Sequence, residues 1–567
     1  MKIVIVGGVA GGATAAARLR RLDETAQIVL LERSGYISYA NCGLPYYIGE
    51  VIEDKQELTL QTPQSFFNRF RIDVRTHSEV VEVRPQEKIV MVRRIEDGTE
   101  YAESYDKLIL APGAKAIHPH LPGSDSSKIM TLRTVEDTFR IKEMSDLAKT
   151  KRVVVVGGGF IGLEVAENLI GRGFRTTVIQ RGEHVLPTID YDLACQVHAY
   201  LRTNGMDLRL NTSVTGFEET EDGIRVITDK GQVEADFVVM AVGVAPESTL
   251  AKKAGLALGQ KDSILVNEHM QTSDPDIYAV GDAVQVRHVV TGAPALIALA
   301  GPANKQARIA ADHICGKNSV FTGSQGTSVL KLFDMTVAST GLNEQSANHA
   351  GVLYDTVITY SANHASYYPG STNMTIKTLF DPLTGKILGA QAVGFEGVDK
   401  RIDILATAIR VGMTDQDLTE LDLAYAPPYA SAKDPVNMVG YVISNVRKGL
   451  VRQYQWSDIQ ALSVRDDVVF LDVRTKKEFE QGHFSGAINI PLDQLRENLS
   501  QLDPAKKLYV NCFSGLRSYL ACRILSQNGF DCYHLAGGYH FYSYIESDIR
   551  FETDPTYPCG IKKGQNA

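Results

Sequence analysis

The order of hydrophobic and polar positions is the same in two stretches of the chain, residues 3–20 and 153–170. Each stretch begins with a short β-branched run, passes through a glycine-rich turn and continues as an alanine-rich helical segment. The runs are apolar at nearly every position, which is typical of parallel strands that are covered on both faces of a sheet. The pattern predicts two copies of a nucleotide-binding α/β unit, the second inserted into the domain that the first begins.

The hydrophobic pattern changes twice further along the chain. Residues 327–449 contain strands and a tyrosine-rich stretch without a glycine fingerprint, which favours a separate interface domain. After residue 452 an α/β pattern restarts with a helix that we expect Ser457 to cap, followed by a strand over 468–473. This last pattern predicts a compact module of roughly 100 residues.

These patterns predict an α/β chain of several domains, since 567 residues are too many for one core. We expect two Rossmann-like domains, an α+β dimerisation domain and a C-terminal α/β domain. The expected ranges are 1–114 with 246–323 for the first domain, 115–245 for the second, 324–450 for the third and 455–560 for the last.

The glycines of both units fit a dinucleotide site. Residues 157–162 satisfy G-x-G-x-x-G between a strand and a helix, where glycines allow the backbone to approach a pyrophosphate at the helix N-terminus. The first unit, 7–12, departs from this pattern because Val9 stands at the second glycine position. The expected contacts are Gly7, Gly8, Ala10, Gly11, Gly12, Glu32 and Arg33 in the first unit, and Gly157, Gly159, Phe160, Ile161, Gly162, Gln180 and Gly243 in the second.

The residues that follow the second strand of each unit help to select the nucleotide that binds there. Glu32 ends a strand at the position where a carboxylate binds a ribose hydroxyl. The second unit has Gln180 and Arg181 there, so no carboxylate rejects a 2′-phosphate. The choice between NADH and NADPH therefore stays open at this point.

Composition narrows the class of protein. The net charge is −9 without a basic tail, which argues against nucleic acid as a partner, and no apolar run is long enough to span a membrane. Because a strand pattern starts at the first residues, we expect no signal peptide. Seven cysteines form no regular framework, so we expect free thiols and a cytoplasmic enzyme.

The two units, with residues 111–114 between them and 277–282 after them, resemble the pyridine nucleotide-disulfide oxidoreductase family. This resemblance implies FAD in the first unit, a nicotinamide in the second, and hydride transfer between them. It also implies that Asp282 binds the FAD ribitol and that Ala111 and Gly113 lie at the flavin.

The strip 38–42 resembles the active site of coenzyme A-disulfide reductases, which have a single redox cysteine, here Cys42. The Gly-Leu-Pro turn after Cys42 is expected to present the thiol at a loop, where a helix N-terminus or the flavin edge lowers its pKa. Segments 363–370 and 423–429 resemble those that send two tyrosines, here Tyr367 and Tyr425, across a homodimer interface to the sulfur. The expected coenzyme A contacts are Arg18, Arg21, Ser38, Asn41, Asn304 and Lys433.

Residues 455–555 resemble a rhodanese, a sulfurtransferase domain, in three motifs over 471–474, 482–491 and 512–517. The loop between a strand over 508–511 and a helix over 518–527 is expected to form an anion-binding nest around Cys512, with Arg517 as a catalytic residue. A tyrosine-phosphatase-like loop is the competing interpretation. Four residues separate Cys512 from Arg517 whereas that family has five, and the tighter ring favours sulfur.

The other cysteines and the histidines suggest packing rather than chemistry. Cys195, Cys315, Cys522 and Cys532 are expected to pack in the interior, while Cys559 lies near a tail where it would be exposed. No histidine spacing indicates a metal site.

The resemblances together imply an enzyme similar to NADH-dependent persulfide reductases, acting on persulfides or disulfides of small thiols such as coenzyme A. The alternatives are a coenzyme A-disulfide reductase with an accessory rhodanese domain, an NADH oxidase or peroxidase, and a protein that delivers sulfur to a partner.

Overall fold

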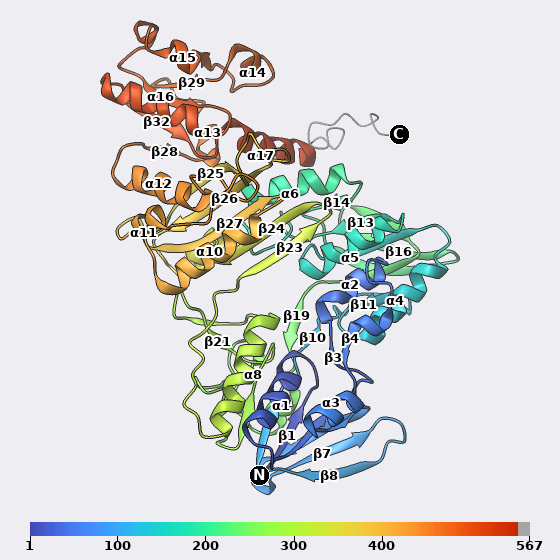
Figure 1. Ribbon diagram of the computed structural model, residues 1–567. Coiled ribbons are helices and arrows are strands. Elements are labelled where there is room, and N and C mark those ends of the chain that lie inside the picture. Colours follow the sequence, from blue (N-terminus) through green and yellow to red (C-terminus); the bar gives the residue numbers. More distant parts are fainter. Residues whose placement is uncertain (554–567) are drawn as a thin grey trace. The chain divides into compact units, whose positions relative to one another are not determined.

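The computed structural model describes residues 1–553 and divides the chain into two compact units (Figure 1). The first unit comprises Met1–Glu183 and Gly205–Gly326, and the second comprises His184–Asn204 and the chain from Thr327 onward. Each unit contains two sheets that position candidate functional residues. The predicted α/β fold class with two Rossmann-like domains, an α+β domain and a C-terminal α/β domain is confirmed.

The sheet that begins the first unit is parallel, with strand order β20-β9-β1-β2-β5. Its β1 side chains alternate between two cores: Ile3 and Ile5 pack with helices α1 and α8, while Val4 and Val6 pack on the opposite face. This two-sided burial explains why the strand is apolar throughout. The element bounds are β1 Lys2–Val6, α1 Ala10–Leu22, β2 Gln27–Leu31, β5 Asp73–Arg75, β9 Lys107–Leu110, β20 Ile277–Ala279 and α8 Ala300–Ile314.

A second parallel sheet, in the order β11-β18-β12-β13-β14, repeats this arrangement in the same unit. Helix α5 follows β12 through the second glycine turn, and a three-stranded antiparallel sheet, β15-β16-β17, packs against one face. The bounds are β11 Ile129–Thr131, α4 Val135–Leu147, β12 Arg152–Val156, α5 Phe160–Gly171, β13 Arg175–Ile179, β14 Asp207–Arg209, β15 Val214–Thr220, β16 Gly223–Thr228, β17 Gly231–Ala235 and β18 Phe237–Met240.

The second unit begins with an antiparallel sheet in the order β23-β24-β27-β26-β25. Its strand β27 is buried at every position, since other elements cover both of its faces. The bounds are β23 Ser328–Leu332, β24 Met335–Gly341, β25 Asp355–Ala362, β26 Asn373–Phe380, β27 Ile387–Gly394, α10 Val398–Val411, α11 Asp415–Glu420 and α12 Pro435–Arg447.

The last sheet is parallel, with strand order β28-β32-β31-β29-β30 and an apolar core on each face. The expectation that Ser457 caps a helix is wrong. Residues Trp456–Asp458 form a 3-10 turn, and Gln455 and Asp458 make the capping box before α13. The bounds are β28 Gln453–Tyr454, α13 Ile459–Leu462, β29 Val468–Asp472, α14 Lys476–Glu480, β30 Ile488–Asn489, α15 Leu492–Leu495, β31 Lys507–Asn511, α16 Leu516–Gln527, β32 Cys532–Leu535 and α17 Gly538–Thr553.

Helix α6 (Tyr191–Thr203) belongs to the second unit although its sequence lies between β13 and β14 of the first. A buried charge cluster attaches its N-terminal end to the antiparallel sheet. The Lys377 ammonium lies 3.0 Å from Asp190, 2.8 Å from Asp192 and 3.1 Å from Glu344. The Lys377 side chain is only 2% exposed, so these carboxylates stabilise a charge that water does not reach.

None of the helices in the described part of the chain is both long enough and apolar enough to cross a membrane.

Candidate active site

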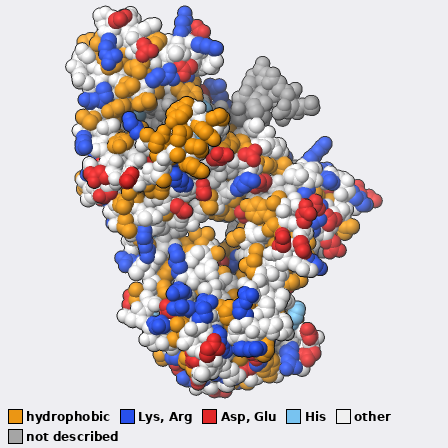
Figure 2. Space-filling view, in the orientation of Figure 1, with side chains coloured by type: hydrophobic (Ala, Val, Ile, Leu, Met, Phe, Trp, Pro, Cys, Tyr) orange, Lys and Arg blue, Asp and Glu red, His pale blue; other side chains and the backbone are white. Residues whose placement is uncertain are grey.

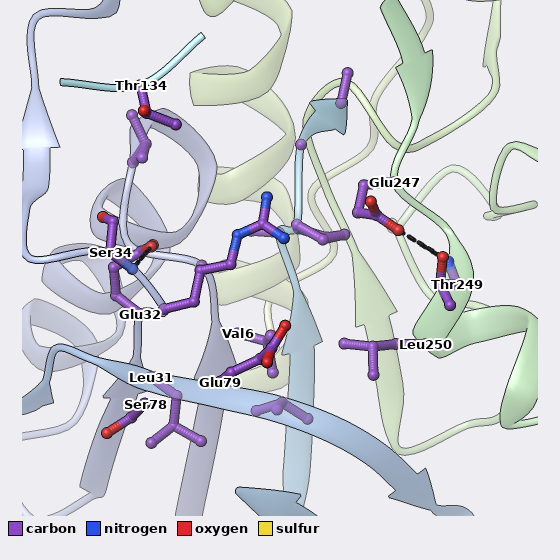
Figure 3. A pocket seen from close by; sticks show the side chains of 18 of the residues that line it. Val6, Leu31, Glu32, Ser34, Ser78, Glu79, Thr134, Glu247, Thr249 and Leu250 are labelled. Atoms are coloured by element: carbon purple, nitrogen blue, oxygen red, sulfur yellow. Dashed lines mark hydrogen bonds between the residues drawn. The ribbon is translucent and has the colours of Figure 1, made fainter. Parts of the chain in front are cut away.

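A cavity of about 450 Å³ lies at the carboxyl ends of the first sheet's strands (Figure 3). Gly7, Glu32, Arg33, Ala111 and Gly113, all predicted nucleotide contacts, line it. Its volume is within the range of small-molecule and cofactor sites. Open α/β sheets bind their ligands at the carboxyl ends of their strands, which is where this cavity lies.

The glycines around this cavity are required by close backbone contacts. A Cβ on Gly7, whose φ is +98°, would lie 2.2 Å from the Ala111 oxygen, and one on Gly12 would lie 1.8 Å from the Gly7 oxygen. The Glu32 carboxylate accepts from the backbone N–H of Gly8 at 2.7 Å and of Ser34 at 2.8 Å. These contacts form a tight turn before α1 and hold a carboxylate beside it, so the residues fit FAD.

The second glycine turn has the same construction. A Cβ on Gly157, with φ +111°, would lie 2.3 Å from the Ala241 oxygen, and one on Gly162 would lie 2.0 Å from the Gly157 oxygen. Gln180 accepts from the Gly158 N–H at 2.9 Å, in the role that Glu32 has in the first unit. Gly159 has open space around it, Phe160 and Ile161 begin α5, and Gly243, with φ +114°, follows β18. This turn therefore fits a nicotinamide dinucleotide.

Asp282 and Arg133 form an ion pair at the flavin-type cavity. An Arg133 guanidinium nitrogen lies 2.7 Å from the Asp282 carboxylate, and its Nε donates to the Ala114 carbonyl at 3.2 Å. Arg133 lines the cavity and reaches it from the turn before α4. The predicted ribitol carboxylate thus has a cationic partner that the sequence did not reveal.

Cys42 lies in a 3-10 turn, Asn41–Gly43, directly before helix α2 (Leu44–Ile48), and is exposed. Desolvation by the surrounding protein raises the pKa of the thiol, the charge of Glu164 raises it further, and that of Arg133 lowers it. The residues alone therefore oppose ionisation, in contrast to the lowered pKa expected from the sequence. Tyr46, one helical turn after Cys42, hydrogen-bonds to Glu164, and burial raises the pKa of that glutamate to about 7.

Helices α1 and α8 of the first unit carry three of the predicted coenzyme A residues, Arg18, Arg21 and Asn304. Thr14 of α1 donates to Asn304 of α8 at 2.5 Å, and Arg18 pairs with Asp312 at 2.7 Å. Arg21 is exposed on α1, and Figure 2 shows Lys and Arg side chains gathered where α8 lies in Figure 1. Ser38 has φ +45° and lies in β3 (Ile37–Tyr39), which leads into the Cys42 turn.

The two predicted tyrosines meet in the second unit. Tyr367 follows β25 and Tyr425 follows α11, and their hydroxyl oxygens lie 2.9 Å apart. Both side chains are exposed, by 74% and 48%. Lys433 is exposed just before α12. A hydroxyl pair displayed on the surface is suited to a ligand or partner outside its own unit.

Cys512 lies at the end of β31, where the chain turns into α16, and is 1% exposed. The Gly515 N–H points at the sulfur, with N···Sγ 3.1 Å, and the Ser518 hydroxyl lies 3.3 Å from it. Tyr539 and His540 of α17 donate their N–H groups to the carbonyls of Cys512 and Phe513. Donors converging on Sγ stabilise an anionic sulfur.

Arg517 does not point freely into this loop. Its guanidinium makes a two-pronged ion pair with Glu478 of α14, at 2.9 and 2.6 Å. Hydrogen bonds from Arg517 and Thr475 lower the pKa of Glu478 to about 2, against the desolvation that raises it. At the end of β29, Arg474 and Asp472 form a buried ion pair at 2.6 Å.

The remaining cysteines differ in their surroundings. Cys195, Cys522 and Cys532 are buried, as expected, but Cys315 is only half-buried at the end of α8. Cys559 lies outside the described residues.

The Cys195 sulfur lies 3.7 Å from the Asp548 carboxylate, which also accepts from His198 at 3.1 Å and Arg202 at 2.5 Å. The sequence gives no local sign of this cluster, because Asp548 lies 350 residues from His198. This buried group joins α6 to α17, and a metal ion would have to replace hydrogen bonds that these atoms already make.

Four residues that lie at the two cysteine sites were not predicted from the sequence. Tyr46 and Glu164 carry local signals, because one lies a helical turn after Cys42 and the other two residues after the glycine motif. Glu478 follows Thr475 in a capping-box pattern, but nothing in the sequence indicates its pairing with Arg517. His534 has no local signal, since it reaches Ser518 from the neighbouring strand β32.

The class of protein follows from comparison with known families. The chain matches the family models for pyridine nucleotide-disulphide oxidoreductase over residues 1–307, for the dimerisation domain of that family over 327–435, and for a rhodanese-like domain over 456–543. It therefore belongs to the pyridine nucleotide-disulphide oxidoreductase family, as its motifs predicted, and carries a rhodanese-like domain. It is a flavin-dependent oxidoreductase, and FAD and NAD(P)H are the cofactors that this family implies.

Three particular proteins are similar over most of the chain. The coenzyme A disulfide reductase of Staphylococcus haemolyticus is 39% identical over 443 residues, 78% of this chain and 98% of that protein. Reduced CoADR-RHD of Bacillus anthracis has a TM-score of 0.94 at 46% identity, covering 96% of this chain and 98% of that one. A NAD-dependent persulfide reductase from A. fulgidus has a TM-score of 0.90 at 38% identity, covering 95% and 100%.

Proposed function

We propose that this protein uses NAD(P)H to reduce the persulfide of a small thiol, with coenzyme A as the best candidate, and releases sulfide. The observation that carries the proposal is that one chain holds two different sulfur sites. Cys42 is exposed beside a flavin-type cavity, and Cys512 is held in a loop of converging donors. Relatives named coenzyme A disulfide reductase and persulfide reductase support this choice of substrate.

The reductive half of the proposed cycle takes place at Cys42. Its thiolate attacks the sulfur of coenzyme A persulfide that is bonded to carbon, a Cys42–coenzyme A disulfide forms, and the terminal sulfur leaves as hydrosulfide. FAD bound in the cavity would pass the electron pair of NAD(P)H to this disulfide. Cleavage then returns the Cys42 thiolate and free coenzyme A, so two electrons enter for each hydrosulfide released.

Cys512 would supply the sulfur. Its persulfide transfers the terminal sulfur to the thiolate of coenzyme A, which leaves a Cys512 thiolate and coenzyme A persulfide. The Gly515 N–H and the Ser518 hydroxyl are placed to stabilise the sulfur anion that departs. In this scheme a small thiol carries sulfur between the two cysteines.

Cationic and polar side chains would bind coenzyme A. Arg18, Arg21 and Asn304 lie on α1 and α8, where cationic side chains suit its phosphates. Ser38 and Asn41 flank the reactive thiol. We infer a homodimer in which Tyr367 and Tyr425 of one protomer approach Cys42 of its partner and stabilise the leaving thiolate, with Lys433 at the same ligand.

The proposal is tested by mass spectrometry and by sulfide release. Protein purified without reductant should carry a coenzyme A adduct on Cys42, which Cys42→Ser removes. With NADH and coenzyme A persulfide, Cys42→Ser should release no sulfide, whereas Cys512→Ser should remain active, because this substrate enters the cycle after Cys512. With NADH, catalytic coenzyme A and thiosulfate as the sulfur donor, Cys512→Ser should release much less sulfide than the parent chain while still reducing coenzyme A disulfide. Full sulfide release from thiosulfate in Cys512→Ser would overturn the role of Cys512.

A coenzyme A-disulfide reductase with an accessory rhodanese domain is the second candidate. It is favoured by the curated relatives with that activity in their names, which match 78% of this chain. Reduction of coenzyme A disulfide together with unchanged sulfide release from thiosulfate and coenzyme A in Cys512→Ser would select it.

A further inference from the structure

Three side chains form a hydrogen-bonded row behind the Cys512 loop. The Cys512 sulfur lies 3.3 Å from the Ser518 hydroxyl, and that hydroxyl lies 3.4 Å from Nδ1 of His534. The residues come from the end of β31, from α16 and from β32, so only the folded module brings them together. The Ser518 oxygen also lies 2.9 Å from the Gly515 carbonyl oxygen.

His534 is buried, with 6% of its surface exposed, and its other ring nitrogen, Nε2, has no hydrogen-bond partner among the described residues. Burial lowers the pKa of His534 to about 4, so the ring is neutral at neutral pH and carries a single N–H. A proton on Nε2 would be a buried donor without an acceptor, whereas a proton on Nδ1 has the Ser518 oxygen beside it. The Nδ1–H tautomer is therefore favoured, since an unpaired buried N–H is costly.

This tautomer determines what Ser518 can do. Because Nδ1–H of His534 donates to the Ser518 oxygen, the single hydroxyl hydrogen must point elsewhere, to the Gly515 carbonyl or to the Cys512 sulfur. A neutral thiol leaves the carbonyl as the better acceptor. An anionic thiolate or persulfide attracts the hydrogen instead, because a hydrogen bond to a charged acceptor is the stronger one.

We propose that His534 is a positioning residue for sulfur transfer: it orients Ser518 so that the hydroxyl donates to Cys512 whenever this sulfur is anionic. The inference rests on the proposed role of Cys512 as a sulfur carrier. The other titratable groups that interact electrostatically with Cys512 are Arg517, which is paired with Glu478, and the buried residues Tyr454 and Cys522, whose pKa values are raised. None of these directs the Ser518 hydroxyl.

The test measures how Cys512 ionises in the full-length flavoprotein. The rate of modification by methyl methanethiosulfonate, a small neutral reagent, is followed against pH by mass spectrometry of the peptide that contains Cys512. Poor access slows the reaction at every pH but leaves the midpoint unchanged, so the midpoint reports the thiol pKa. Ser518→Ala and His534→Leu should raise the midpoint by about one pH unit, equivalent to about tenfold less thiolate at neutral pH.

Matched variants separate orientation from packing. His534→Asn places an amide N–H where Nδ1 was and should keep the parent midpoint, as should Ser518→Thr, which retains a hydroxyl. His534→Gln carries its amide closer to the former Nε2 and should behave like His534→Leu. The emission maximum of Trp456, the only tryptophan of the chain, shows whether each variant module has folded.

The outcomes are decisive in both directions. An unchanged midpoint in folded His534→Leu or Ser518→Ala overturns the proposal, as does a midpoint in His534→Asn equal to that of His534→Leu. The readout needs neither NADH nor coenzyme A persulfide. Loss of the proposed reductase function would therefore appear in the sulfide assay and not in these curves.

Discussion

Replacing Glu478 by Gln should change which sulfur donors the Cys512 loop accepts. Glu478 occupies Arg517 through two hydrogen bonds, and its pKa of about 2 against an ordinary 4.5 corresponds to about 3 kcal/mol. The hydrogen bond from Thr475 accounts for part of this energy. Solvent also screens the ion pair, because the Glu478 and Arg517 side chains are 27% and 31% exposed, so roughly 1–2 kcal/mol remains for the interaction of Glu478 with Arg517. An anionic donor must overcome that energy to bind Arg517. Gln at this position keeps the capping box with Thr475, so α14 should persist.

The assay is cyanide-dependent sulfur transfer from thiosulfate, a dianion, measured as thiocyanate. Glu478→Gln should lower the KM for thiosulfate by about 5- to 30-fold, the range that 1–2 kcal/mol allows. Glu480→Gln, which removes a carboxylate exposed on the same helix, should leave that KM unchanged. The reasoning is refuted if thiosulfate KM does not fall in Glu478→Gln, or if Glu480→Gln lowers it equally.

Three further predictions follow from described contacts. Lys377→Met leaves the buried Asp190 and Asp192 and the partly exposed Glu344 without their cation and should lower the free energy of unfolding by about 3–5 kcal/mol. Because burial raises the pKa of Glu344, part of this stability should be recovered as pH falls and that carboxyl protonates in the folded state, measured by denaturation at pH 5 and 8 with Trp456 fluorescence. Glu164→Gln should lower the pKa of Cys42, with faster alkylation above pH 7, where Glu164 is charged, and no difference below about pH 6. Gly12→Ala should abolish FAD retention, measured as flavin absorbance per chain, whereas Gly171→Ala, with open space around it, should retain flavin.

Much of the fold was predictable because its signals are local. A strand such as 3–6, apolar throughout and followed by a glycine turn, has few alternatives to a doubly covered parallel sheet. The glycines were equally predictable, since a Cβ on Gly12 would lie 1.8 Å from a carbonyl oxygen and one on Gly162 would lie 2.0 Å from one. The Ser457 cap failed because Gln455, two residues earlier, competes for the same helix start.

The finer features of the site depend on partners far apart in sequence. Arg517 was predicted as a catalytic residue of the loop, but its charge is engaged by Glu478, 39 residues earlier. The pKa of Cys42 could not be predicted from its turn alone, because the charge that raises it comes from Glu164 on α5, a helix of the second nucleotide-binding unit. Cys195 looked like an ordinary apolar helix residue, whereas its sulfur contacts a carboxylate 353 residues away. Long-range electrostatics therefore sets chemistry that local patterns leave undetermined.

Helix α6 has a consequence for any attempt to cut the protein into parts. It is encoded within the nucleotide-binding region, yet it supplies His198 and Arg202 to Asp548 of α17, the last helix of the rhodanese-like module. A single protease cut between α12 and β28 would break the backbone but leave these buried contacts intact. The two fragments should therefore remain associated on a sizing column, and expressing the rhodanese-like module alone would leave Asp548 without its cation.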